Sequence, residues 1–194
     1  YGLVGSEMCI RDRRKKHRAI MVGIGTVLTD NPMLNCRIEN GRNPIRIVCD
    51  SKLRIPLDCN ICKTANEIST LVVSAIENPE KQSELEKMGV KTLILPDKNG
   101  KVDLKKLMQY LGEKSIDSVL IEGGGTLAYS ALQSKIVSHI YSYIAPKIFG
   151  GENAKTPVES VGVETPDDCF KLKRTNVREL GSDILIEYDV LEVQ

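Results

Sequence analysis

The sequence has no excess of charge, no long apolar run and almost no histidine, and each shortage excludes a class of protein. Its 27 basic and 26 acidic side chains leave a formal net charge of +1, so no broad electrostatic field favours nucleic acid or an anionic membrane. No apolar run approaches the ~20 residues of a membrane-spanning helix. His17 and His139 are the only histidines, and no metal-ligand cluster is visible. Any ligand must therefore be bound locally.

The cysteines do not indicate a disulfide framework. The motif CNIC (59–62) has the C-x-x-C spacing of zinc and redox sites, but neither a second pair nor histidines accompany it. We interpret this pair as ordinary reduced thiols in a loop. Five of the six cysteines lie outside the first thirteen residues. This odd number and the lack of a leader peptide indicate a reducing, cytoplasmic compartment.

The first thirteen residues differ in character from the rest of the chain. The stretch LVGSEMCIRDR (3–13) has charged residues where a signal peptide needs an apolar centre. It also lacks the apolar stripe of an amphipathic helix. Its codons would resemble those of a transposase-based sequencing adaptor. We therefore expect residues 1–13 to be non-native and the domain to occupy residues 14–194, with a genuine N-terminal arm as the alternative.

Short β-branched runs and helical segments alternate along the remaining chain. Strands are predicted at residues 19–25, 45–50, 69–75, 90–96 and 118–124. Such runs are typical of parallel strands covered on both faces. Helices are predicted at 78–89 and 103–114 from their apolar spacing and end signals. A long strand at 139–150 and two strands joined by a turn at 181–183 follow. The pattern predicts one α/β domain whose mostly parallel sheet ends in antiparallel strands.

The strongest candidate binding site is the stretch VLIEGGGTLAYSALQ. Gly123, Gly124 and Gly125 follow a predicted strand and lead into a helix near Thr126. Glycine permits positive φ and lets a pyrophosphate approach the backbone, and a helix N-terminus attracts anions. The acidic residue of an ordinary Rossmann NAD site is absent downstream. A tight turn without a ligand is the alternative.

Two further strand ends carry polar groups. VGIGTVLTDNPMLNCR offers Thr26 and Asp30 after a strand, which fits either a plain loop or a site. IVCDSKLRIP offers Ser51 with the cations Lys52 and Arg54. Hydroxyls and cations suit the 2′-phosphate of NADPH, and a solvated charged turn is the alternative.

Glu122 ends an apolar strand beside the glycine loop. A carboxylate there could hold a sugar hydroxyl or assist proton transfer at a carbonyl or imine that is being reduced. It could equally cap the glycine turn by accepting backbone N–H bonds. No nucleophile–base set is visible.

Four stretches occur in the order found in one enzyme family. They are GIGTVLTDNPMLNCR, PIRIVCDSKLRIP, VLIEGGGTLAYSALQ and YIAPKIFGG. Together they resemble the reductase domain of the bifunctional riboflavin-biosynthesis deaminase/reductase. The resemblance covers roughly residues 14–190 and implies a dihydrofolate-reductase-like, three-layer α/β fold. It also implies NADPH-dependent reduction of the ribosyl C1′ of 5-amino-6-(5-phosphoribosylamino)uracil to the ribitylamino product.

The same resemblance implies roles for individual residues. The implied substrate contacts are Arg14, Leu34, Arg37 and Glu122. The two arginines would hold the 5′-phosphate, which suits a planar guanidinium, and Glu122 would be the catalytic group near the reacting carbon. The implied NADPH contacts are Thr26, Asp30, Ser51, Gly124, Gly125, Thr126, Leu127, Ala128, Tyr129 and Ser130. No metal is implied.

The front of the chain departs from the family pattern. The family's reductase domain begins with a lysine-bearing strand, followed by serine and tryptophan contacts, and the chain has no tryptophan at all. We therefore expect a truncated reductase domain, separated from its deaminase domain and impaired as a fragment. The family's usual pairing of subunits implies a homodimer.

Other functions remain open at this stage. One is reduction of the pyrimidine before its deamination, or of a pterin. Another is a non-catalytic NADP-binding module.

Overall fold

Five parallel strands form the larger of two sheets in the computed structural model, which describes residues 7–36, 38, 41–148, 150–152, 154 and 156–191, with only the backbone for residues 7–11. The strand order is β4-β3-β2-β1-β5. The strands are β1 (Ala19–Gly23), β2 (Ile45–Cys49), β3 (Thr70–Ser74), β4 (Val90–Ile94) and β5 (Val119–Ile121). All five predicted strands are confirmed, although each is shorter than expected. Because they are parallel, their carboxyl ends lie at one edge of the sheet.

The helices connect and cover these strands. They are α1 (Glu7–Lys16), α2 (Ile24–Asp30), α3 (Asn60–Lys63), α4 (Pro79–Lys87), α5 (Leu104–Glu113) and α6 (Gly125–Gln133). Side-chain caps explain two of the predicted starts, since Asn78 accepts a hydrogen bond from the Lys81 N–H and Asp103 accepts one from the Lys106 N–H. Within the described residues, no helix has the length and apolarity of a membrane span.

Two sequence-based expectations about these helices were wrong. The first strand was expected to continue through Gly25, but α2 begins at Ile24, directly after an extended Gly23. Burial of Ile24 and Val27 in the core stabilises this short helix. The stretch around CNIC was expected to be a loop, and it contains the single-turn helix α3.

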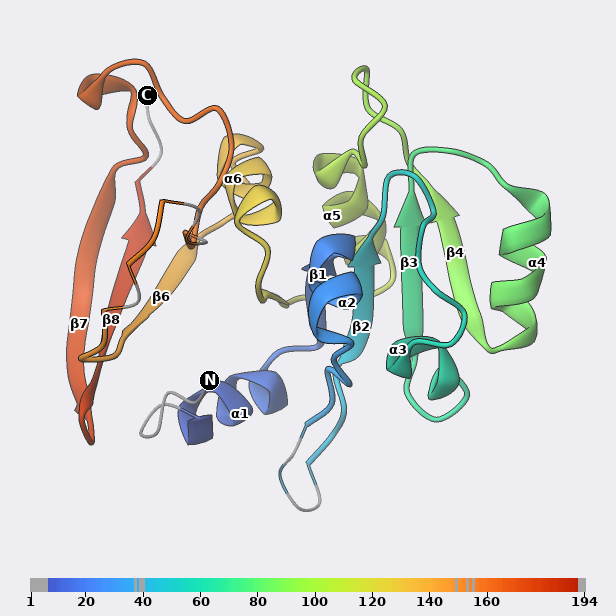
Figure 1. The fold of residues 1–194 in the computed structure, drawn as a ribbon, viewed down its shortest axis with the longest axis horizontal. Helices are drawn as coiled ribbons and strands as arrows, with labels where there is room; N and C mark the ends of the chain where they lie inside the picture. Colours follow the sequence, from blue (N-terminus) through green and yellow to red (C-terminus); the bar gives the residue numbers. More distant parts are fainter. Residues whose placement is uncertain are drawn as a thin grey trace.

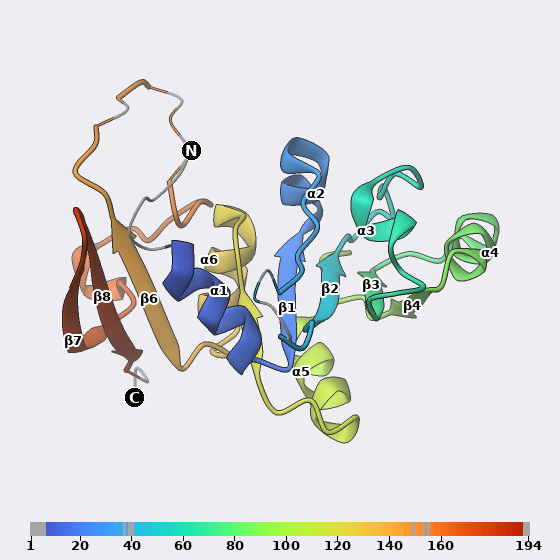
Figure 2. The ribbon, with the colours of Figure 1, turned by 90° about the horizontal axis from the view of Figure 1, so that it is seen from below.

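Alternate residues of the parallel strands point into two separate cores. Ile20 and Val22 of β1 pack with residues of α2, α3 and α4. Ala19 and Met21 pack on the other face with residues of α5 and α6. Figure 2 shows α2 and α3 on one side of β1 and β2, and α5 on the other. This arrangement confirms the prediction that both faces of the sheet are covered.

The antiparallel strands form a sheet of their own. It consists of β6 (His139–Ile144), β7 (Leu172–Leu180) and β8 (Asp183–Val190) in the order β6-β8-β7, and a 3₁₀ helix, η1 (Pro166–Asp168), precedes β7. The predicted strand at 139–150 therefore ends earlier, at Ile144. The predicted turn is confirmed, with Gly181 at a φ of 66°. Figure 1 shows this sheet beside α6, apart from the parallel sheet.

Helix α1 contacts both sheets through consecutive arginines. The Arg13 guanidinium lies 3.2 Å from the ring centre of Tyr141 in β6 and donates a 2.9 Å hydrogen bond to the Tyr143 hydroxyl. Arg14 bonds to Glu122, which directly follows β5. The end of α1 thus lies between the sheets.

Candidate active site

A cleft of about 1020 Å³ lies along the carboxyl ends of the parallel strands. Its walls come from α2, the loop after β2, the loop before α5, the glycine bend with the start of α6, and the segment 156–159. The lining residues are Gly23, Ile24, Gly25, Thr26, Thr29, Asp30, Cys49, Ser51, Lys52, Arg54, Asn99, Gly100, Lys101, Val102, Leu104, Gly123, Gly124, Gly125, Thr126, Leu127, Ser130, Thr156, Pro157 and Glu159. The cleft therefore occupies the sheet edge that the sequence predicted.

The glycine bend has the geometry that the sequence suggested. Gly123 and Gly124 have φ angles of 71° and 81°, which side chains rarely adopt. A Cβ on Gly123 would lie 3.3 Å from the Thr26 hydroxyl oxygen, so the hydroxyl faces the bend. Gly124 is the N-cap residue of α6 and, as a glycine, has no side chain to cap the helix. The bend therefore offers backbone N–H groups, a hydroxyl and a helix N-terminus to an anion.

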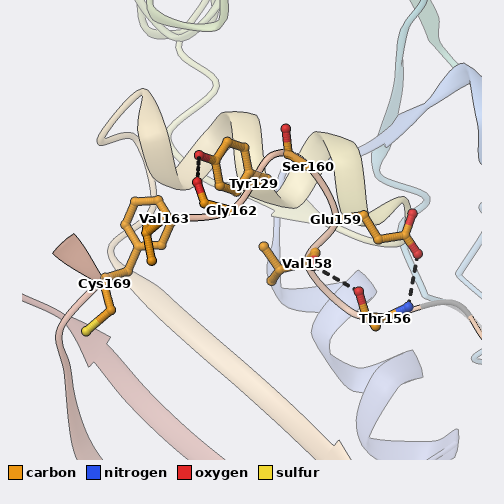
Figure 3. A pocket seen from close by; sticks show the side chains of 9 residues that line it. Tyr129, Thr156, Val158, Glu159, Ser160, Gly162, Val163 and Cys169 are labelled. Atoms are coloured by element: carbon orange, nitrogen blue, oxygen red, sulfur yellow. Dashed lines mark hydrogen bonds between the residues drawn. The ribbon is translucent and has the colours of Figure 1, made fainter. Parts of the chain in front are cut away.

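Glu159 lies against the same helix start. A Cβ placed on Gly125 would lie 2.6 Å from Glu159 Cγ, so only glycine leaves room for this side chain. The Glu159 carboxylate accepts a 3.0 Å hydrogen bond from the Thr156 N–H (Figure 3). An anionic side chain thus lies beside the place where a phosphate would meet α6. No sequence pattern indicated it.

The end of β2 is fixed by a buried carboxylate. The Asp50 side chain is fully buried and accepts a 2.8 Å hydrogen bond from the Ile55 N–H. Arg54 Nε lies 3.9 Å from the other carboxylate oxygen. Burial raises the pKa of Asp50, and the Ile55 N–H and Arg54 partly oppose this rise. Asp50 therefore shapes the loop that presents Lys52 and Arg54 to the cleft.

Ser51 has a structural partner as well as a place in the cleft. Its hydroxyl oxygen accepts a 3.1 Å hydrogen bond from the Val102 N–H. This bond holds the loop before α5 against the end of β2. The Ser51 hydroxyl hydrogen remains available for a ligand oxygen, because the backbone bond uses only an acceptor position of the hydroxyl.

Arg14 and Glu122, which the sequence placed separately on the substrate, are bonded to each other. Arg14 Nε lies 2.9 Å from Glu122 Oε1, and Nη2 lies 2.6 Å from Oε2. Arg14 Nη1 also donates to the Asn35 carbonyl at 3.2 Å. The Glu122 N–H donates to the Met21 carbonyl at 3.0 Å. The pair lies next to Gly123, beside the cleft and not among its lining residues.

Most of the remaining predicted residues line the cleft, and the others do not have a described place in it. Thr26, Asp30, Ser51, Gly124, Gly125, Thr126, Leu127 and Ser130 line the cleft together. Leu34 is 3% exposed and packs in the core. Ala128 does not line the cleft. Arg37 lies outside the described residues.

Tyr129 points into a second, smaller cavity of about 370 Å³. Its hydroxyl donates a 2.8 Å hydrogen bond to the Gly162 carbonyl, and its ring meets that of Phe170 edge to face (Figure 3). The side chain therefore anchors the segment 158–163 on α6 and does not reach the cleft.

Two parts of the cleft were missed by sequence reasoning. The loop Asn99-Gly100-Lys101 follows β4, and a polar Asn-Gly turn at a strand's carboxyl end was a usable signal. Thr156 and Glu159 come from a segment far along the chain, and no local pattern links them to α6. Among the described residues, no group of three His, Cys, Asp or Glu side chains could hold a metal ion.

Comparisons with known proteins agree on one family. The model described as "RibD C-terminal domain" matches residues 6–186. The riboflavin biosynthesis protein RibD of Actinobacillus pleuropneumoniae is 46% identical over 182 residues, which are 94% of this chain and 48% of that protein. The chain therefore spans about half the length of this relative.

A shorter relative and a solved structure extend the comparison. The 2,5-diamino-6-ribosylamino-4(3H)-pyrimidinone 5′-phosphate reductase of Methanothermobacter thermautotrophicus is 35% identical over 93% of this chain and 83% of that protein. The structure of Acinetobacter baumannii RibD, form 2, matches with a TM-score of 0.83 and 26% identity, over 96% of this chain and 51% of that one. The expected dihydrofolate-reductase-like fold is thereby confirmed.

Proposed function

The chain belongs to the RibD C-terminal domain family, and from this premise we propose that it is an NADPH-dependent reductase of riboflavin biosynthesis. The proposed reaction reduces the ribosyl C1′ of 5-amino-6-(5-phosphoribosylamino)uracil to give the phosphoribitylamino product. The observation that carries the proposal is the cleft in which Thr26, Ser51 and the glycine bend meet, beside the Arg14–Glu122 pair.

The residues of the cleft suit NADPH. The bend at Gly124 and the start of α6 would hold the diphosphate, because a helix N-terminus and glycine backbone favour anions. Ser51, Lys52 and Arg54 line the cleft at the end of β2, and they would hold the 2′-phosphate. When bound, NADPH would supply the hydride for the reduction.

The Arg14–Glu122 pair would serve the substrate. A guanidinium has five N–H donors, and Arg14 keeps some of them beyond its bonds to Glu122 and Asn35. These donors would hold the 5′-phosphate. Glu122 would accept hydrogen bonds from the ribityl hydroxyl groups near C1′. Arg37 is the second arginine that we propose for the phosphate.

The direct test follows NADPH oxidation by the purified chain in the presence of the phosphoribosylaminouracil. We expect substrate-dependent oxidation with NADPH and much slower oxidation with NADH. Mass spectrometry of the product should show the gain of two hydrogens. NADPH binding without any product by the full-length parent protein would instead support the non-catalytic module, because this chain alone is expected to be impaired as a fragment. Failure to bind NADPH would refute both readings.

A second substrate is favoured by one observation. The relative from Methanothermobacter thermautotrophicus, most of which aligns with this chain, is named for the diamino-pyrimidinone, the form before deamination. The two pyrimidines differ at one exocyclic group. A competition assay would supply both pyrimidines to a limiting amount of enzyme. The ratio of the two reduced products would show which pyrimidine the enzyme prefers.

We also propose the remaining features of the parent protein. They are its cytoplasmic location, its assembly as a homodimer and a deaminase domain in the same parent chain. For this chain, we propose that residues 1–13 are non-native. Light scattering of the purified chain tests the dimer, and a monomeric mass at micromolar concentration would contradict it.

A further inference from the structure

Cys59 and Cys62 lie together in a part of the fold that the cleft does not use. Helix α3 is beside the start of β3, at the edge opposite the strand's arrowhead (Figure 1). The Lys63 N–H donates to the Cys59 carbonyl at 3.0 Å, so the two cysteines are three positions apart in one helical turn. Cys59 is the extended residue that directly precedes α3, and Cys62 lies within its single turn. Their exposed fractions are 4% and 1%.

The two thiols also interact with each other. The Cys62 thiol and the N–H groups of Cys62 and Ile61 favour the anionic form of the Cys59 sulfur. They lower the pKa of Cys59, although burial acts in the opposite direction. The pKa of Cys62 is raised, because its proton is held by Cys59. Cys59 is therefore the more acidic thiol of the pair, and Cys62 holds its proton more tightly.

A buried cation lies directly behind the pair. Arg46 is fully buried, and its guanidinium donates to the Ile61 carbonyl at 2.9 Å and to the Thr64 hydroxyl at 2.7 Å. In the described part of the chain, its hydrogen-bond acceptors are hydroxyl and carbonyl oxygens, and none is a carboxylate. A buried positive charge whose hydrogen bonds go to neutral oxygens favours a nearby thiolate, although Glu67 also interacts with this charge.

We propose that Cys59 and Cys62 form a redox-active dithiol that closes to an intramolecular disulfide on reaction with a disulfide oxidant such as glutathione disulfide. The Cys59 thiolate attacks one sulfur of the oxidant, which forms a mixed disulfide and releases one glutathione thiolate. Cys62 then loses its proton and attacks the Cys59 sulfur, which releases the second glutathione. The two cysteines are oxidised, and one glutathione disulfide is reduced to two thiols.

The reaction requires local opening of α3, because Cys59, Ile61 and Cys62 pack in the core. The single turn is held to the end of α2 by two exposed hydrogen bonds, from Asn60 N to Asn31 Oδ1 at 2.8 Å and from Asn60 Nδ2 to the Asn31 carbonyl at 2.7 Å. Local opening that breaks such surface bonds requires less free energy than global unfolding. It would expose Cys59, the less buried of the two.

The test compares cysteines within one molecule. The reduced, native chain is incubated with glutathione disulfide at neutral pH, and the remaining thiols are alkylated before peptide mass spectrometry. We expect a peptide with an internal 59–62 disulfide. It should form at least about tenfold faster than any modification of Cys36, because thiolate character controls the rate. Cys36 is a matched control, since it is also buried, at 8% exposed, and is free.

Variants separate the two steps. Cys62→Ser should stop the reaction at a mixed disulfide on Cys59. Cys169→Ser, at an exposed cysteine, should leave closure unchanged. The proposal is overturned if Cys59 reacts no faster than Cys36, or if the disulfide forms only at urea concentrations that unfold the chain. The wild-type measurement decides even if a variant does not fold.

Discussion

Arg14 and Glu122 form a two-point ion pair across 108 positions of sequence, with Arg14 Nη2 and Glu122 Oε2 2.6 Å apart. Charge-assisted pairs with this geometry are strong and directional. Their side chains are only 15% and 21% exposed, which limits screening by solvent. The pair joins α1 to the end of β5, and each residue fixes the orientation of the other. A substrate bound here would contact both the Arg14 guanidinium and the Glu122 carboxylate, each held in a fixed orientation.

Glu122→Gln is expected to lower turnover by about 10²-fold or more if Glu122 also assists proton transfer at C1′, because this is the usual scale for loss of such a group. NADPH affinity should stay nearly unchanged, because Glu122 does not line the cleft. Steady-state kinetics and a separate NADPH titration test both points. Unchanged turnover would remove Glu122 from the mechanism.

Arg14→Lys keeps the positive charge and removes the planar guanidinium group. We expect the substrate KM to rise about tenfold, because a lysine cannot make the two parallel bonds. Arg18→Lys is the control, since Arg18 pairs with Asp117 at 3.7 Å on the exposed surface. Equal effects of both substitutions would contradict a specific role for Arg14.

Glu159→Gln is expected to tighten binding of NADPH about two- to fivefold, from the removal of a negative charge beside a helix N-terminus. Isothermal titration at low and high salt measures the change, which should shrink as salt screens the charge. Glu164→Gln is the control. Glu164 is exposed, lies shortly after Glu159 in the chain and does not line the cleft. Weaker binding in Glu159→Gln would mean that the carboxylate supports the site.

Asp50 predicts a specific pH dependence of stability. Its folded pKa is raised above the ordinary 3.8 by burial, so the folded state holds the proton at pH values where the unfolded state has lost it. The free energy of unfolding should therefore fall as pH rises from about 3.8 through the folded pKa. Asp50→Asn should flatten this part of the profile. Urea unfolding at several pH values tests it, and identical profiles would refute the prediction.

The origin of residues 1–13 has its own test. We expect the genomic DNA upstream of the Arg14 codon to differ from the adaptor-like codons. It should encode a reductase first strand and a deaminase domain with zinc-ligand cysteines. Genomic codons that match residues 3–13 would instead support a native N-terminal arm. The contacts of Arg13 with Tyr141 and Tyr143 would then be native contacts.

Local signals predicted the regular elements well. Short β-branched runs such as residues 70–74 favour buried strands, and the caps Asn78 and Asp103 mark helix starts. Helix α2 was missed because glycines flank Ile24, and core packing outweighs their poor helix propensity. The separate antiparallel sheet was missed because strand patterns do not specify which sheet a strand joins.

The sequence by itself determined the edge at which a ligand would bind, because consecutive parallel strands bring their carboxyl ends, and so Thr26, Ser51 and Gly124, to one place. Only the tertiary structure decided which side chains meet there. The pairing of Arg14 with Glu122, the position of Glu159 on Gly125 and the turn of Tyr129 away from the cleft each join parts of the chain that no local pattern connects. Such contacts depend on how the sheets and loops pack in three dimensions, whereas periodicity describes only neighbours along the chain.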